Sequence, residues 1–145
     1  MGSAMRTLAA FVAVSVLISA APALAAIVHF TAKLDGASET PPNDSKGTGE
    51  AKVTLNTTTR NITWTVTYSG LTGAATAAHF HGPAPAGKAA PVAVPMTPPL
   101  TSPIKGSATI TDIQVGNLRG GLWYVNVHTA AHPAGEIRGQ LAEVR

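Results

Sequence analysis

Apolar and polar residues alternate in short runs from residue 27 to the end of the chain. Because successive side chains of a strand point to opposite faces, this period of two predicts half-buried β-strands. In "NITWTVTYSG", Ile62, Trp64, Val66 and Tyr68 share one face, and the threonines share the other. The same pattern, bounded by Gly, Pro, Asn and Asp, predicts strands at residues 27–34, 49–56, 61–70, 76–81, 106–113, 121–128 and 135–144.

A proline-rich stretch, residues 82–106, separates the fourth and fifth of these strands and contains seven prolines. Proline fixes φ and removes a donor of the strand ladder, so we expect an extended loop with a short edge strand at "PVAVP". A disordered linker is the alternative, but it would leave a half-domain on each side. The sequence therefore favours one all-β domain, a Greek-key β-sandwich or flattened barrel of seven to eight short strands.

The first 25 residues have the composition of a leader. Residues 1–4 are interpreted as an expression scar, and residues 5–25 as a signal peptide with a positive charge, an apolar run and an "ALA" exit. The single domain then occupies residues 26–145. We expect a periplasmic or secreted protein, with no membrane attachment after the signal peptide is cleaved.

Composition and charge exclude several classes of function. Ten basic and seven acidic residues are dispersed without a basic stripe, so nucleic acid is not an expected partner. No nucleophile elbow, P-loop or dinucleotide fingerprint is present. The chain has no cysteine, so a metal site must use nitrogen or oxygen ligands, or methionine sulfur. Whether the protein is a monomer or a homo-oligomer stays open.

Four of the five histidines fall in two short segments. In "AAHFHGPA", His79 and His81 are two residues apart and so share one face of a strand. In "GLWYVNVHTAAHPAGEIRG", His128 ends a strand and His132 follows in a turn. If the two strands are neighbours, we expect these four imidazoles to bind one metal ion, with ordinary surface histidines as the alternative. Imidazole-only sites suit copper, zinc or nickel, and the Irving–Williams order favours Cu2+ for a given set of nitrogens, so we expect copper (Cu2+/Cu+) rather than zinc.

The alternation also predicts which side chains lie next to this metal site. Tyr124 and Asn126 share the face of His128 and, with Glu136, are expected to orient the imidazoles. Arg138 lies on the following strand, and we expect its guanidinium at the mouth of the metal site, where it would attract a small anion. A surface pair between Glu136 and Arg138 is the alternative.

These motifs resemble the CHRD domain, the module named after chordin. The resemblance is carried by "AAHFHGPA", "WYVNVHTAAHPAGEIRGQL" and "LDGASETPP", and it covers residues 27–142. The family does not by itself imply a chemistry, because chordin modules are known as parts of an extracellular antagonist of growth factors.

The order of the histidines is also similar to the copper site of copper–zinc superoxide dismutases. Those enzymes are Greek-key barrels that hold copper with an H-x-H strand pair, a loop histidine and a later strand-end histidine. The resemblance implies that His79 and His81 are the strand pair and His128 the late histidine. It also implies that Arg138 is the arginine that guides superoxide.

The residues and the two resemblances predict an exported copper-only superoxide dismutase. Residues 82–105 contain no His or Asp, so the zinc site of those enzymes is absent, and His132 is expected to supply the fourth nitrogen. Two alternatives stay open. One is a copper-binding or copper-delivery protein without turnover, and the other is an extracellular structural or adhesion module.

Overall fold

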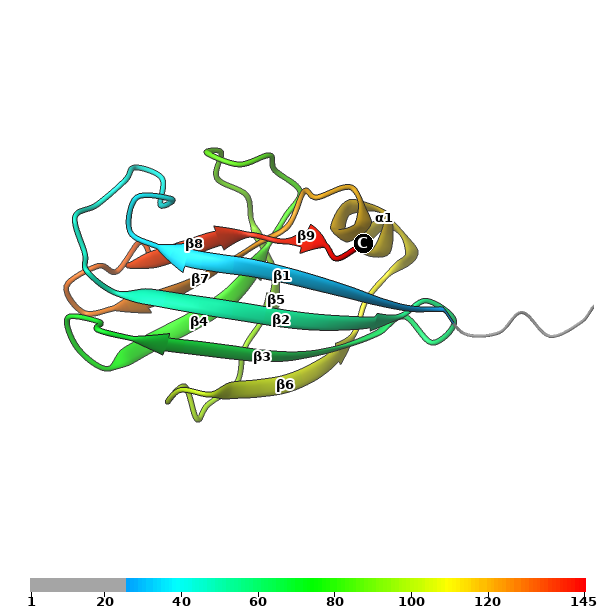
Figure 1. Cartoon of the computed structure of the whole chain (residues 1–145), viewed down its shortest axis with the longest axis horizontal. Helices are drawn as coiled ribbons and strands as arrows, with labels where there is room; N and C mark the ends of the chain where they lie inside the picture. Colours follow the sequence, from blue (N-terminus) through cyan, green and yellow to red (C-terminus); the bar gives the residue numbers. More distant parts are fainter. Residues whose placement is uncertain (1–25) are drawn as a thin grey trace, which may run out of the picture.

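The computed structural model describes residues 26–145, which form a twisted antiparallel sheet that nearly closes into a barrel (Figure 1). The strands follow the order β5-β4-β7-β8-β1-β2-β3-β6, and β9 pairs with β1. The all-β class predicted from the alternation is confirmed. The elements are β1 (Ile27–Asp35), β2 (Thr48–Asn56), β3 (Asn61–Ser69), β4 (Ala75–His81), β5 (Val92–Pro95), β6 (Ile104–Thr109), α1 (Asp112–Arg119), β7 (Tyr124–Thr129), β8 (Ile137–Gln140) and β9 (Ala142–Glu143).

The predicted expression scar and signal peptide lie outside the described residues. Within residues 26–145, no helix has the length and apolar character that a membrane crossing requires.

The apolar face of each long strand is the buried face. In β3, Ile62 and Val66 are fully buried and Trp64 is 6% exposed, while Thr63 and Thr67 face solvent. β2 pairs with β3 along its whole length. A slip of one residue would turn every apolar side chain outward, so burial of this face fixes the register.

One predicted strand is shorter than expected, because a helix replaces its end. The pattern predicts a strand over residues 106–113, but β6 ends at Thr109 and α1 begins at Asp112. The side chain of Thr111 accepts a hydrogen bond from the Gln114 backbone, and the Gln114 side chain accepts one from the Thr111 backbone. This capping box, visible as "TDIQ", starts the helix. Only Leu118 of the helix is buried, so its helical periodicity in the sequence is weak.

The two histidine-bearing strands are neighbours. β4 pairs with β7, which places His79 opposite Asn126 and His81 opposite Tyr124. β7 pairs in turn with β8, which places Asn126 opposite Arg138. The expected edge strand at residues 92–95 is β5, which covers the other side of β4. Three separate stretches of sequence therefore meet at one part of the sheet.

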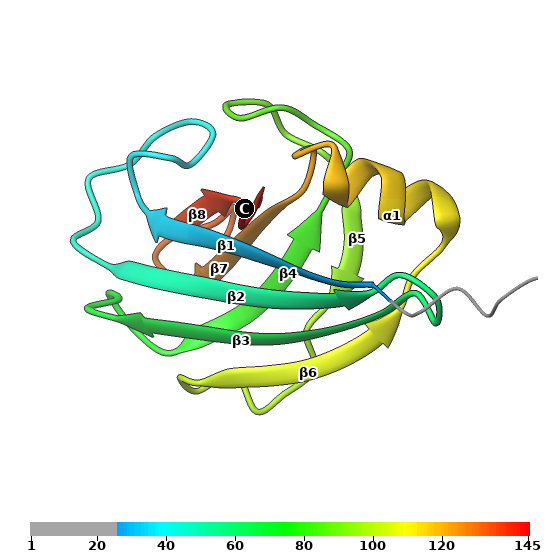
Figure 2. The ribbon, with the colours of Figure 1, turned by 45° about the vertical axis from the view of Figure 1, so that its right-hand side comes forward.

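All six residues of β7 are buried, so both of its faces are covered. Val125 and Val127 belong to the hydrophobic core, as the alternation predicts. Tyr124, Asn126 and His128 lie on the opposite face. Figure 2 shows the loop after β1 and the loop between β4 and β5 rising on the same side of the sheet, near β7 and β8. These two loops cover the polar face of β7, so the side chains of Tyr124, Asn126 and His128 are buried although they point away from the hydrophobic core.

Candidate metal centre

Three imidazoles converge where β4 lies beside β7. One nitrogen from each of His79, His81 and His128 lies within 4.8 Å of the other two. Nδ1 of His79 is 3.1 Å from Nε2 of His128. A tetrahedral site with ligands at about 2.0–2.1 Å separates its ligand atoms by roughly 3.4 Å. The cluster therefore has the dimensions of a site for one ion.

Backbone carbonyls fix which nitrogen of two imidazoles faces the cluster. Nδ1 of His81 is 2.9 Å from the Ala90 carbonyl oxygen, and Nδ1 of His128 is 3.0 Å from that of Pro133. A carbonyl oxygen only accepts, so each Nδ1 carries a proton and each Nε2 faces the cluster, where the neutral ring offers a lone pair. Nε2 of His81 is buried and has no hydrogen-bond partner among the described residues. A bound metal ion would satisfy this orphaned atom, so the donor set fits a metal.

The surroundings favour the neutral, metal-binding form of these imidazoles. Burial lowers the pKa of His79, and the neighbouring His128 and His81 lower it further. Burial also lowers the pKa of His128, although its hydrogen bond to Pro133 acts in the opposite direction. Because only a deprotonated ring nitrogen binds a metal, both shifts keep the site available at neutral pH.

The fourth predicted ligand lies elsewhere. His132 stands in the turn after β7, where its backbone N–H donates to the Thr129 carbonyl oxygen at 3.1 Å. Its side chain lines a separate cavity of about 210 Å3 together with Glu39 and other loop residues. Among residues 26–145, the metal-sized group contains three histidines and not His132. The turn explains the difference, because it carries the chain away from the β4–β7 contact.

The sequence predicts that Arg138 stands at the open mouth of the metal site. This prediction is wrong, because Arg138 is only 2% exposed. Its Cζ lies 3.5 Å from the centre of the Tyr124 ring, and the same ring stacks on His81 at 4.8 Å between centroids. Because β7 lies between β4 and β8, Tyr124 separates the guanidinium from His81. Arg138 also donates to Thr40 Oγ1 and to the Lys88 carbonyl. Its role in guiding superoxide stays a prediction.

Glu136 neither orients an imidazole nor forms a surface pair with Arg138, the two roles that the sequence analysis considers for it. Its side chain is fully buried, so no surface pair with Arg138 exists among the described ion pairs. Its carboxylate instead accepts hydrogen bonds from Ser45, Thr72 and Thr129. Glu136 therefore joins two loops to the end of β7 and does not orient an imidazole.

Two polar residues next to the cluster form a chain that only partly follows from the sequence. Asn126 shares the face of His128, as the alternation predicts, and its Oδ1 lies 3.0 Å from Nε2 of His128. Because an amide oxygen only accepts, Nε2 donates in this contact, and a metal ion bound at Nε2 would displace that proton. On its other side, Asn126 lies beside the Glu39 carboxyl and lowers its pKa, although burial is the larger effect and raises that pKa. Glu39 is missed by the sequence analysis, because nothing in its loop shows that it folds over β7.

The fold and the cluster define an antiparallel β-protein with three histidines that can hold a metal ion. A family model described as the CHRD domain matches residues 30–141, and the chain belongs to this family. No curated protein and no solved structure matches the chain. The likeness to the copper site of superoxide dismutases therefore rests on the histidines alone.

Proposed function

We propose that this protein is an exported copper-binding protein that holds one copper ion with His79, His81 and His128. The observation that carries the proposal is the convergence of three ring nitrogens within 4.8 Å on two adjacent strands. An all-imidazole set suits copper, zinc or nickel, and the Irving–Williams order places Cu2+ highest. The leader-like pattern of residues 5–25 supports a periplasmic or secreted location.

We further propose that the site dismutates superoxide. Bound copper would supply one-electron exchange between Cu2+ and Cu+, by which two superoxide anions and two protons give dioxygen and hydrogen peroxide. Three protein ligands leave a coordination position for a small molecule, and His79 is only half-buried, which keeps the site close to solvent. The carbonyls that hold His81 and His128 keep the ring orientation constant while the charge of the ion changes.

The test is to load demetallated protein with one equivalent of Cu2+ and to measure two quantities. Electron paramagnetic resonance should show hyperfine coupling from imidazole nitrogens. Superoxide should decay faster than with free copper plus chelator. The variant His81→Ala should lose both signals, whereas His29→Ala, which removes an exposed histidine bonded to Thr54, should keep both.

The outcomes separate the proposed function from its alternatives. Copper binding without superoxide decay would make the protein a copper-binding or copper-delivery protein. Preference for Zn2+ over Cu2+ in a competition experiment would overturn the choice of metal. Absence of binding by either ion would favour a structural or adhesion module.

A further inference from the structure

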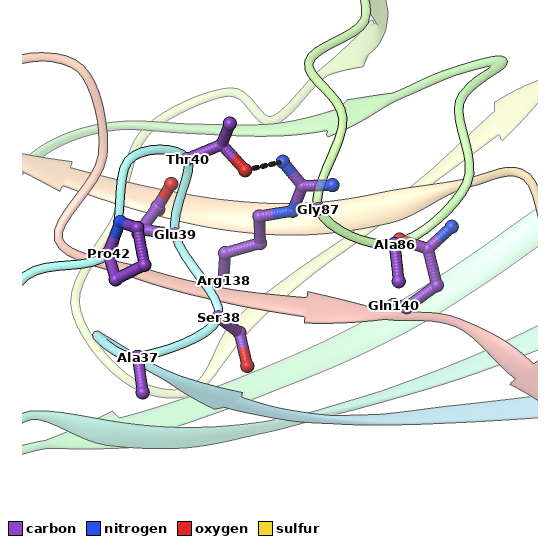
Figure 3. Close-up of a pocket in the computed structure, with 9 residues that line it drawn as sticks. All are labelled: Ala37, Ser38, Glu39, Thr40, Pro42, Ala86, Gly87, Arg138 and Gln140. Carbon is purple, nitrogen blue, oxygen red and sulfur yellow. Dashed lines mark hydrogen bonds between the residues drawn. The ribbon is translucent and has the colours of Figure 1, made fainter.

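A second cavity lies on the far side of Tyr124 from the histidines. It has a volume of about 470 Å3 and lies between the loop after β1 and the loop after β4. Arg138 and Gln140 enter it from β8 (Figure 3). The rest of its wall consists of Ala37, Ser38, Glu39, Thr40, Pro42, Ala86 and Gly87. None of the three clustered histidines lines it. Cavities of this size bind small organic molecules.

Arg138 brings a positive charge without a direct ion-pair partner among the described residues into this cavity. The Glu39 carboxyl lines the same cavity and lies close enough to interact with this charge, although burial raises the Glu39 pKa. The contacts of Arg138 are the Tyr124 ring, Thr40 Oγ1 and the Lys88 carbonyl, all of which are uncharged. In the described part of the chain, no ion pair includes Arg138, although it is 2% exposed. A buried charge is costly unless it is paired. The three contacts fix the guanidinium plane, and the N–H groups that they leave unused match the two oxygens of a carboxylate.

Gln140 adds a neutral acceptor on the same face of β8. Its Nε2 donates to the carbonyl oxygens of Ala84 and Gly121 at 2.9 and 2.8 Å, which fixes the orientation of the amide. The other amide atom, Oε1, is buried and has no hydrogen-bond partner among residues 26–145. Such an acceptor is unfavourable when unpaired, so it is suited to a ligand that donates a hydrogen bond.

We propose that this cavity binds a small carboxylic acid that carries a hydroxyl group next to the carboxylate. The carboxylate pairs with Arg138, and the hydroxyl donates to Gln140 Oε1. A hydroxyl is favoured over an ammonium group, because an ammonium beside the guanidinium would be repelled. The Tyr124 ring separates this site from the metal site, so the binding of such an acid does not depend on copper.

The test is a titration of 15N-labelled, demetallated protein with lactate and with propionate, which differ only in the hydroxyl group. Lactate should produce saturable shifts in the Arg138 Nε–H and Gln140 side-chain signals. One lost hydrogen bond should make propionate about fivefold weaker. Arg138→Gln should weaken lactate binding about tenfold or more, because the loss includes a charged hydrogen-bond pair. Arg119→Gln, an exposed arginine on α1, is the matched control and should bind as the unchanged protein does.

Because Arg138 is buried, a second variant leaves it in place. Ala86 lines the cavity and is exposed, so Ala86→Trp should fill the space without disturbing the fold and should abolish the lactate shifts. The proposal is overturned if lactate gives no saturable shift at about 50 mM, a concentration that detects even a millimolar Kd. Equal weakening by Arg119→Gln would show non-specific charge attraction, and equal affinity for propionate would remove Gln140 from the site.

Discussion

At the level of single residues, backbone carbonyls and buried hydrogen bonds decide what each polar side chain does. The carbonyls of Ala90 and Pro133 orient His81 and His128 toward the cluster. Glu136, by contrast, accepts hydrogen bonds on both carboxylate oxygens from two loops and from the end of β7, and it has no free lone pair to offer a metal or a substrate. We therefore expect Glu136 to affect the free energy of unfolding of the protein.

We predict that Glu136 makes the protein sensitive to acid. Burial by itself raises the pKa of this carboxyl, but the hydrogen bonds from Thr129, Ser45 and Thr72 outweigh burial and lower the pKa to about 2. A pKa lower in the folded state than in the unfolded state contributes stability above the unfolded value near 4.5, and this contribution is lost as the pH falls toward 2. The shift corresponds to about 3 kcal/mol.

Urea unfolding at several pH values checks this prediction. The free energy of unfolding of the unchanged protein should exceed that of Glu136→Gln at pH 6, and the gap should narrow as the pH falls from 5 to 2. A gap that stays constant over this range would contradict the assigned pKa.

At the level of elements, β8 holds the two halves of the sheet together. It pairs with β7 on one side and meets β1 on the other, where Asp35 lies opposite Arg138. A Cβ at Gly139 would lie 2.2 Å from the Lys33 backbone oxygen, so only glycine allows this close approach. The close contact between β8 and β1 therefore depends on the absence of a side chain at Gly139.

We predict that Gly139→Ala destabilises the protein, whereas Gly116→Ala does not. The added methyl group at Gly139 would push β8 away from the backbone of β1, and we expect a loss of about 2 kcal/mol or more. Gly116 lies within α1, and a Cβ there meets nothing within 4 Å. Because alanine favours a helix over glycine, Gly116→Ala should gain about 0.5–1 kcal/mol. Thermal unfolding of the two variants measures both effects, and equal loss in both would refute this account of the close contact between β8 and β1.

At the level of the whole molecule, the nearly closed sheet brings the histidine cluster and Arg138 to one face of the β4-β7-β8 segment. The strand order places His81 on one side of Tyr124 and Arg138 on the other. The loop between β4 and β5 serves both groups of residues, because its Ala90 carbonyl holds His81 and its Lys88 carbonyl holds Arg138. Ligands bound to either group should stabilise the fold as a unit.

We predict that copper raises the melting temperature of the protein. A ligand that binds only the folded state contributes about 2.7 kcal/mol at one hundred times its Kd. For a domain of this size, the expected rise is roughly 10 °C. Addition of a chelator should reverse it, and His128→Ala should abolish most of it while His29→Ala leaves it unchanged. An unchanged melting temperature of demetallated protein in excess copper would contradict a specific site.

The alternation along the chain was enough to predict most of the strands, their buried faces and the same-face relation of His79 and His81, although the strand predicted at residues 135–144 is divided into β8 and β9. These features follow from local stereochemistry, because a strand has a period of two wherever it pairs. The helix α1 escaped this pattern because it buries only Leu118, and its capping box was the one local signal that marked it.

Only the tertiary structure decided which strands pair and what the loops cover. The pairing of β4 with β7 joins segments far apart in the sequence, and it depends on the burial of the whole core. That pairing brings His128 to His79 and His81, while the turn after β7 carries His132 away. The fold of two loops over β8 buries Arg138, and no local periodicity encodes such a contact between loops.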